Sequence, residues 1–204
     1  MQFTKKQIIN KITQSFRSYQ NLEDKTYMYV FYNNKNKKYE EVQVFYGKEN
    51  FMHLTGIDYK EPKSKKMSST DFYSLLESGE PLVESNIITK NETQLKMEVI
   101  SHISELDKCG PLKVINEQLH MLKSNSNGAL RSKKMIFALG FQQIGLKKIP
   151  KTLLNLRTVG KIQPGHPVLC IYKPSDPNKS KPHHIICKSL GFDNLFKNSP
   201  YPFK

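Results

Sequence analysis

The 204-residue sequence lacks tryptophan and contains only three cysteines. These residues, Cys109, Cys170 and Cys187, lie far apart and form no CxxC pair, which argues against a zinc ribbon or a dithiol redox centre. Cys170 and Cys187 lie in apolar, strand-like runs, so we expect buried thiols and a reducing compartment. No apolar run is long enough to span a membrane, and the first residues lack the apolar core of a signal peptide. We therefore expect a soluble, cytoplasmic protein.

The common nucleotide-binding and metal-binding motifs are absent as well. There is no Walker loop, GxGxxG, HExxH or DxDxDG, and the acidic residues are scattered rather than paired as in a two-metal nuclease. We expect neither a metal nor another cofactor. Histidine, hydroxyl groups, lysine and arginine remain, a set that suits metal-independent RNA cleavage. In that reaction a base takes the ribose 2′-OH proton, an acid protonates the leaving 5′ oxygen, and a cation stabilises the charged phosphorane.

Basic residues are in clear excess over acidic ones. The sequence has 32 Lys and Arg against 18 Asp and Glu, which gives a net charge of +14. A positive field of this size favours an anionic partner, with nucleic acid ahead of an acidic membrane. An AT-rich genome, in which lysine codons are common, is the alternative explanation. We expect RNA as the partner and no membrane association.

The order of periodic segments predicts an α+β fold, with helices packed on an antiparallel β-sheet. Thr4 and Gln7 have capping-box spacing at the start of a helix over about residues 4–20. A hairpin over 27–32 and 41–46 follows, then helices near 70–76 and 92–108. The later part has β-like runs at 112–115, 135–139, 168–172 and 184–187. We expect one domain over residues 1–204, with a core at about 5–190 and a tail at about 196–204 that is ordered only by docking.

His53 is the first candidate catalytic residue. It lies in the segment Phe51–Ile57 directly after the hairpin, with Thr55 and Gly56 beside it. We interpret this position as a strand exit, where polar side chains are rigidly held yet accessible. Imidazole titrates near neutral pH and can serve as base or acid. The alternative is a hydrogen-bonded structural histidine at a strand end.

Lys151, Thr152 and Arg157 form a second candidate group. We interpret the segment after Pro150 as a turn entering a helix, where backbone N–H groups favour phosphate. Arg157 would add a guanidinium, which binds phosphate through two donors. Alternatively, Thr152 only caps the helix and Lys151 is solvated.

Other basic residues are candidates for RNA binding. The loop over 60–66 is either solvated or an arm that follows the phosphate backbone, and the start of the last strand provides a basic edge. The RNA-binding candidates are Lys63, Lys65, Lys66, Lys181 and His183. Three further histidines are interpreted as structural or surface residues: His102, His120 and His166.

The ordered set of segments resembles the fourth subgroup of phage-type barnase–EndoU–colicin–RelE (BECR) nuclease domains, found in phages and integrative elements of Gram-positive bacteria. The resemblance spans about residues 5–190 and is carried by 51–57, 72–73 with Leu76 and Leu82, 93–106, 138–141 and 149–154. It implies a BECR-type α+β fold with helices on a four-stranded antiparallel sheet, and RNA cleavage on the sheet face. It assigns the histidine motif to His53 and Thr55, and the proline–lysine motif to Lys151 and Thr152.

The resemblance implies a toxin-like, metal-independent endoribonuclease of a mobile element that cleaves RNA, such as tRNA, in the cytoplasm of a bacterial host cell. The alternative is a non-catalytic mobile-element protein that binds RNA or a host protein and inhibits a defence or translation factor. An immunity protein or a host target protein is a further candidate partner. The sequence does not determine the oligomeric state.

Overall fold

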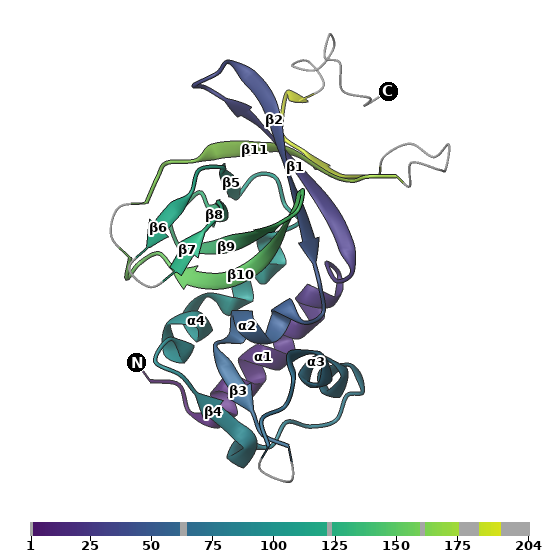
Figure 1. Ribbon diagram of the computed structural model, residues 1–204, viewed down its shortest axis with the longest axis vertical. Helices are drawn as coiled ribbons and strands as arrows, with labels where there is room; N and C mark the ends of the chain where they lie inside the picture. Colours follow the sequence, from purple (N-terminus) through teal and green to yellow (C-terminus); the bar gives the residue numbers. More distant parts are fainter. Residues whose placement is uncertain (1, 62–64, 122–123, 160–161, 176–183, 193–204) are drawn as a thin grey trace.

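The structure is a computed structural model that describes residues 2–61, 65–121, 124–159, 162–175 and 184–192 (Figure 1). Within these residues the helices are α1 (Lys5–Gln20), α2 (Asn50–Thr55), α3 (Ser69–Glu77) and α4 (Thr93–Val99), with the 3₁₀ turns η1 (Glu84–Asn86) and η2 (Ile100–Glu105). The strands of the large sheet are β1 (Lys25–Asn33), β2 (Lys38–Tyr46), β5 (Leu112–Ile115), β8 (Ala129–Ser132), β9 (Phe137–Ile144), β10 (Lys147–Asn155), β11 (His166–Lys173) and β12 (His184–Lys188). Two small sheets pair β3 (Ile57–Tyr59) with β4 (Ile87–Thr89), and β6 (Leu119–Met121) with β7 (Ser124–Ser126).

The helices gather at one end of the molecule and the large sheet occupies the other (Figure 1), so the predicted α+β class is confirmed. The first helix forms as its sequence predicts. The Thr4 side chain accepts the backbone N–H of Gln7, and the Gln7 side chain accepts the backbone N–H of Thr4. The apolar face of α1 is buried against the rest of the chain, with Ile8, Ile12, Phe16 and Tyr19 all inside.

The large sheet has the order β1-β2-β10-β9-β8-β5-β11-β12, and an additional pairing of β1 with β11 closes it on itself. The pairings are antiparallel except for β2 with β10, which run parallel at Val44 and Lys148. The four-stranded antiparallel sheet implied by the resemblance is therefore wrong for this chain. Alternating apolar residues identify strands but not their partners, because the pairing depends on contacts between distant segments.

The helix predicted near residues 92–108 is shorter in the structure than in the prediction. It is α-helical only in α4 and continues as the 3₁₀ turn η2. Of its apolar residues at helical spacing, Val99, Ile103 and Leu106 are buried, whereas Leu95 is 40% exposed. The β-like run at 135–139 also begins late, because Met135 has a φ of 57° and lies in the turn before β9.

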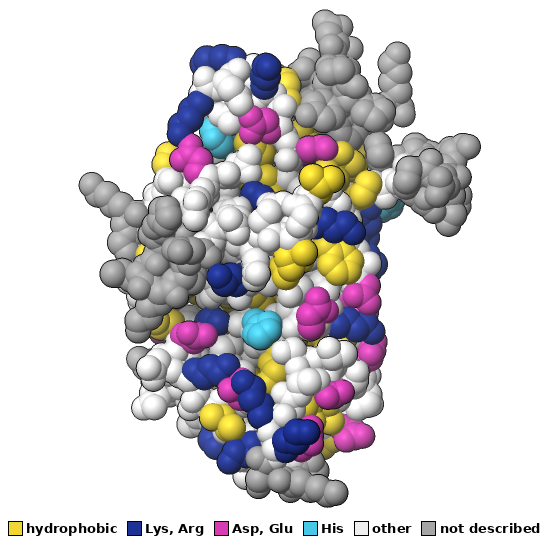
Figure 2. Space-filling model, viewed as in Figure 1, with side chains coloured by type: hydrophobic (Ala, Val, Ile, Leu, Met, Phe, Trp, Pro, Cys, Tyr) yellow, Lys and Arg dark blue, Asp and Glu magenta, His cyan; other side chains and the backbone are white. Residues whose placement is uncertain are grey.

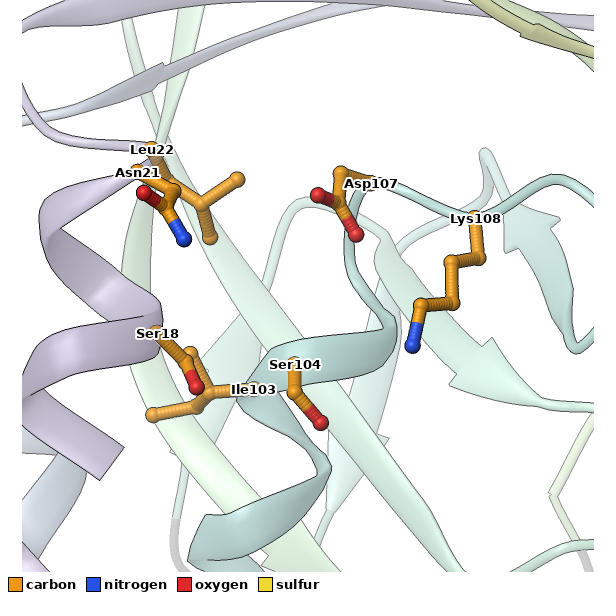
Figure 3. A pocket seen from close by; sticks show the side chains of 7 residues that line it. All are labelled: Ser18, Asn21, Leu22, Ile103, Ser104, Asp107 and Lys108. Atoms are coloured by element: carbon orange, nitrogen blue, oxygen red, sulfur yellow. The ribbon is translucent and has the colours of Figure 1, made fainter. Parts of the chain in front are cut away.

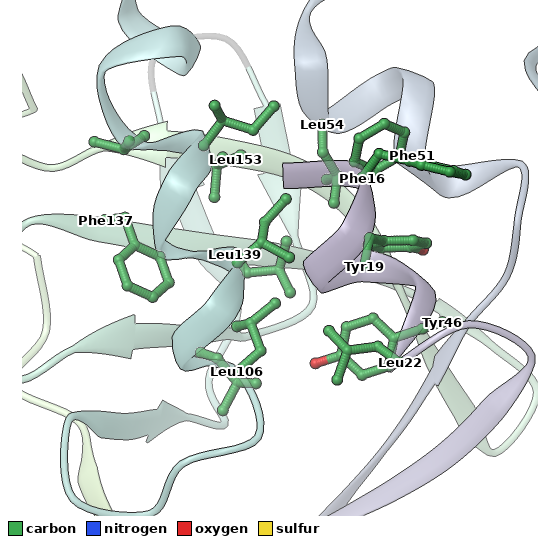
Figure 4. Packing of buried hydrophobic residues seen from close by; sticks show 14 of the residues in the cluster. Phe16, Tyr19, Leu22, Tyr46, Phe51, Leu54, Leu106, Phe137, Leu139 and Leu153 are labelled. Carbon is green, nitrogen blue, oxygen red and sulfur yellow. The ribbon is translucent and has the colours of Figure 1, made fainter. Parts of the chain in front are cut away.

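One large hydrophobic cluster joins the helices to the inner face of the sheet (Figure 4). Several buried tyrosine hydroxyls within it form hydrogen bonds, whereas the buried hydroxyl of Tyr73 has no hydrogen-bond partner among the described residues. The Tyr29 and Tyr46 hydroxyl oxygens lie 2.7 Å apart, and the Tyr29 hydroxyl also donates to the Leu106 carbonyl at 2.8 Å. The Tyr19 hydroxyl donates to the Gly47 carbonyl at 2.7 Å, directly before α2. These contacts fix the end of the β1–β2 hairpin against the helices.

The prediction that Cys187 is a thiol is wrong. Cys109 and Cys187 form a disulfide with their Cα atoms 6.0 Å apart. The two residues are 78 positions apart in the sequence, and the fold joins them by placing β12 beside β11. Spacing alone gives no sign of such a pair. Cys170 is buried as predicted, in a cluster with Met28 and Val30.

Within the described part of the chain, no helix has both the length and the apolar character needed to cross a membrane.

Candidate functional site

His53 lies in the short helix α2 rather than at a strand exit. Phe51, Met52 and Leu54 are buried in the core around it, and the His53 side chain is exposed. A six-residue segment with three buried apolar positions fits a strand or a helix by periodicity, which is why the sequence did not separate the two. The predicted accessibility of the imidazole is confirmed, but the predicted local structure is not.

Thr55 is fully buried at the end of α2. Its hydroxyl donates to the Met52 carbonyl at 2.7 Å and accepts the backbone N–H of Ile57 at 3.4 Å. Gly56 follows in the left-handed conformation, with a φ of 69°. These two residues form the C-terminal cap of α2 and turn the chain into β3. The hydroxyl of Thr55 thus serves the turn that follows His53.

Two lysines meet on one carboxylate oxygen close to His53. The Nζ atoms of Lys66 and Lys90 lie 3.0 Å and 2.7 Å from Oδ1 of Asp58, a residue of β3. The lysine side chains are 63% and 39% exposed, whereas that of Asp58 is only 19% exposed. We call Lys66 and Lys90 the lysine pair. Figure 2 shows basic, acidic and histidine side chains gathered on the face over the helices.

The surroundings of His53 lower its pKa. Partial burial is the largest cause, followed by the positive charges of Lys90, Lys96 and Lys66, while Asp58 acts in the opposite direction. Both burial and nearby cations disfavour the imidazolium form. At neutral pH the neutral imidazole is therefore the dominant form, and it can accept a proton.

Lys96 lies on α4 and is buried, with 6% of its side chain exposed. Its Nζ donates to the backbone carbonyl of His53 at 2.8 Å and lies 3.0 Å from Oε1 of Glu92. Burial lowers the pKa of Lys96, and Glu92 opposes this shift. Glu92 and Lys96 are four residues apart, a spacing that is visible in the sequence, but their relation to His53 is not.

The interpretation of Pro150 to Thr152 as a turn into a helix is wrong, because the segment is part of strand β10. The pairing with β9 shifts at this point, so that Pro150 faces Phe141 and Thr152 faces Gly140. Leu153 packs in the main core, whereas Lys151, which lies at the shift in the pairing, is exposed. Thr152 points to the face opposite Leu153, where its methyl group approaches Gly140.

Strand β10 packs against both α2 and α4. Leu54 of α2 and Leu153 of β10 belong to the same cluster (Figure 4), and the side chain of Asn155 donates to Glu98 just after Lys96 on α4. Lys151 is thus an exposed residue of a strand that packs against both helices. Thr152 is directed away from α2.

Arg157 is exposed and follows the end of β10, where its backbone N–H donates to the Asn155 side chain at 3.0 Å. It is not among the charged residues that act most strongly on the His53 imidazole. Of the predicted RNA-binding residues, Lys65 and Lys66 are exposed. Lys63, Lys181 and His183 lie outside the described residues.

Sequence reasoning missed the contributions of Asp58, Lys90 and Lys96. It also left two histidines without partners that the structure provides: His102 Nδ1 lies 2.6 Å from Glu105, and the His166 ring stacks on Phe31. The three-residue spacing of His102 and Glu105 was a readable signal. Among the residues that the structure describes, no group of three His, Cys, Asp or Glu side chains is arranged to hold a metal ion.

A separate polar pocket of about 220 Å³ lies between the end of α1 and η2 (Figure 3). Its lining contains none of the residues around His53 and consists of Ser18, Asn21, Leu22, Ile103, Ser104, Asp107 and Lys108.

No curated protein and no solved structure gives a significant match to this chain. A protein-family model described as phage-Barnase-EndoU-ColicinE5/D-RelE like nuclease4 matches residues 11–186. The matched region is most of the chain and contains α2, the lysine pair, α4 and β10. A nuclease-type function agrees with an accessible imidazole among cationic side chains. The chain therefore belongs to the phage-Barnase-EndoU-ColicinE5/D-RelE like nuclease4 family.

Proposed function

We propose that this protein is an endoribonuclease that cleaves host RNA without a metal ion, with His53 as the general base. The observation that carries the proposal is the exposed imidazole of lowered pKa, close to two lysines held on one aspartate oxygen. Family membership supports nuclease chemistry in general. The choice of RNA follows from this local set, since a base with neighbouring cations suits attack by a 2′-OH on its own phosphate.

In the proposed reaction, neutral His53 takes the proton of the ribose 2′-OH. The 2′ oxygen attacks the phosphorus atom and the bond from phosphorus to the 5′ oxygen breaks, which yields a 2′,3′-cyclic phosphate and a 5′-OH end. The lysine pair stabilises the charged phosphorane, and one of its ammonium groups protonates the leaving oxygen. Lys151, an exposed residue of the strand that packs against α2, adds a further cation.

Binding without cleavage is the second candidate function. One observation favours it: the charged groups that act most strongly on His53 are three lysines and one aspartate, with no second imidazole among them. Lysines alone are sufficient to bind RNA, or to bind the acidic surface of a host protein. Either kind of binding could block a defence or translation factor.

Incubation of the purified protein with total bacterial RNA in EDTA separates the two candidates. We expect fragments that end in 2′,3′-cyclic phosphate, and tRNA is the first substrate to examine. Binding of RNA without products would favour the binding protein. Cleavage that stops in EDTA and returns with added Mg²⁺ would contradict the metal-independent mechanism.

The pH profile of cleavage should follow the state of His53. The imidazole must be neutral to accept a proton, so kcat/KM falls as the pH drops through the pKa of His53. Because that pKa is lowered, we expect the midpoint of the acidic limb below about 6.5, the ordinary value for histidine. The check is kcat/KM on a dinucleotide substrate between pH 4.5 and 8. A midpoint above 6.5 would show that the cationic surroundings do not act on the catalytic base.

Substitution of the lysine pair should weaken RNA binding and its dependence on salt. In the double variant Lys66→Ser and Lys90→Ser, two phosphate contacts are lost, and each contributes about 0.7 to the slope of log affinity against log salt for single strands. Titration of a labelled single-stranded RNA between 50 and 300 mM salt measures this change. The double variant Lys133→Ser and Lys134→Ser in the exposed turn after β8 is the control. Equal slopes for both variants would show that the lysine pair is ordinary solvated surface.

A further inference from the structure

The end of α2 is held by residues of α4 that lie about forty positions further along the chain. Helix termini leave backbone carbonyls without partners inside the helix. In α2, the carbonyl of His53 is such a group, and it accepts the Lys96 ammonium at 2.8 Å. The Thr93 hydroxyl donates to the Gly56 carbonyl in the turn that follows. The first turn of α4 thus fixes both the residue that carries the imidazole and the turn after it.

The packing around this contact leaves little freedom. Gly56 has a φ of 69°, and a Cβ atom at this position would lie 2.7 Å from Cδ of Lys96. The glycine is required both for the left-handed turn and for the space that the lysine stem occupies. Lys96 is buried, and its ammonium is neutralised by Glu92, whose side chain is 56% exposed. A buried cation is costly unless it is paired and hydrogen-bonded. Here Glu92 pairs the charge, and the carbonyl of His53 accepts the hydrogen bond.

We infer that Lys96 is a positioning residue for His53: its ammonium group fixes the carbonyl end of α2 and so determines how the imidazole is presented to the substrate. This inference rests on the proposed function of His53. Displacement of a catalytic group by about 1 Å can reduce the rate by about a hundredfold. Loss of the Lys96 contact is therefore expected to act on catalysis although Lys96 itself does not reach the substrate.

Lys96 also acts on the imidazole through its charge. The charged groups with the largest effect on His53 are Lys90, Lys96, Lys66 and Asp58. Lys90 directly follows β4 and Lys96 lies on α4, whereas Asp58 lies on β3 and Lys66 follows the loop after β3. Strand β10 also packs against α2, and its Lys147 and Lys151 are exposed. Helices α1 and α3 also contact α2 but contribute none of the strongest charges. Removal of the Lys96 charge should therefore raise the pKa of His53.

Three variants test the inference by NMR titration of the His53 ring in the absence of RNA. Lys96→Met keeps the apolar stem and removes the charge, so the pKa of His53 should rise. Lys96→Arg keeps the charge, so the pKa should stay low. Glu92→Gln removes the carboxylate that offsets Lys96, so the pKa should fall below that of the wild type. Thermal unfolding of each variant establishes that it is folded.

Kinetic measurements then distinguish a role of Lys96 in positioning His53 from a role only in the stability of the fold. In Lys96→Met we expect kcat on RNA to fall by about 10- to 100-fold, KM to change little, and the acidic limb to move to higher pH. Lys96→Arg should restore most of kcat. If Lys96→Met is folded and leaves both the His53 titration and kcat unchanged, the inference is overturned. If the wild type does not cleave RNA, the proposed function fails, and the His53 titration in Lys96→Met decides alone whether Lys96 controls the imidazole.

Discussion

Replacement of His53 by alanine should lower the rate of RNA cleavage by about two to four orders of magnitude, the usual contribution of a general acid–base group. The imidazole of His53 has a lowered pKa and lies close to the lysine pair, so without it the 2′-OH would lose its proton acceptor. The effect should appear in kcat, because RNA binding depends on the lysines, which the variant keeps. Single-turnover cleavage of a labelled RNA in EDTA measures the rate.

The same variant should remain folded. His53 is exposed in α2, and exposed substitutions usually change the free energy of unfolding by no more than about 0.5 kcal/mol. His184→Ala is the matched control, because His184 is exposed at the first position of β12 and has no part in the proposed reaction. A folded His53→Ala protein with wild-type activity would exclude His53 as the base. Equal losses in both variants would point to contamination or to a general effect on RNA binding.

Local patterns predicted those parts of the fold that local contacts determine. The capping box of Thr4 and Gln7 and the apolar spacing of α1 are sufficient for that helix, and the β1–β2 hairpin follows from two runs joined by a polar turn. The segment after Pro150 was misread because proline is common at helix starts. In β10 the proline is tolerated at the point where the pairing with β9 shifts.

The candidate site could not be predicted from the sequence without knowledge of the fold. Lys90 reaches Asp58 because β3 and β4 pair with Asp58 opposite Ile88, two residues before Lys90. Lys66 reaches the same oxygen because its bridge to Lys60 brings the chain back beside β3. A sequence contains no record of that register when strands of three residues are separated by a long connection. The histidine itself was identifiable from its residue type and neighbours. Its cationic surroundings were not, since they come from three separate segments of the chain.

Replacement of Phe51 by alanine should lower the free energy of unfolding by about 3–5 kcal/mol, the usual cost of removing a buried phenylalanine. Phe51 is fully buried, and its ring centroid lies 5.5 Å from Phe16, 5.1 Å from Tyr19 and 6.4 Å from Tyr73. These rings come from α1, α2 and α3 and hold the helix that carries His53. Figure 4 shows Phe51 beside Phe16 and Tyr19 of α1. Such a loss is large compared with the total stability of a typical domain, about 5–15 kcal/mol.

Urea unfolding of the wild type and of Phe51→Ala measures this loss as a lower midpoint with an unchanged slope. Leu146→Ala is the control, because Leu146 is 91% exposed and its removal should leave the midpoint almost unchanged. Activity should fall with the folded fraction and, in the folded molecules, through a less rigid α2. A loss below about 1 kcal/mol in Phe51→Ala would contradict the role of the aromatic cluster as the anchor of α2, and would leave the contacts of Lys96 and Thr93 as the main support of the segment that carries His53.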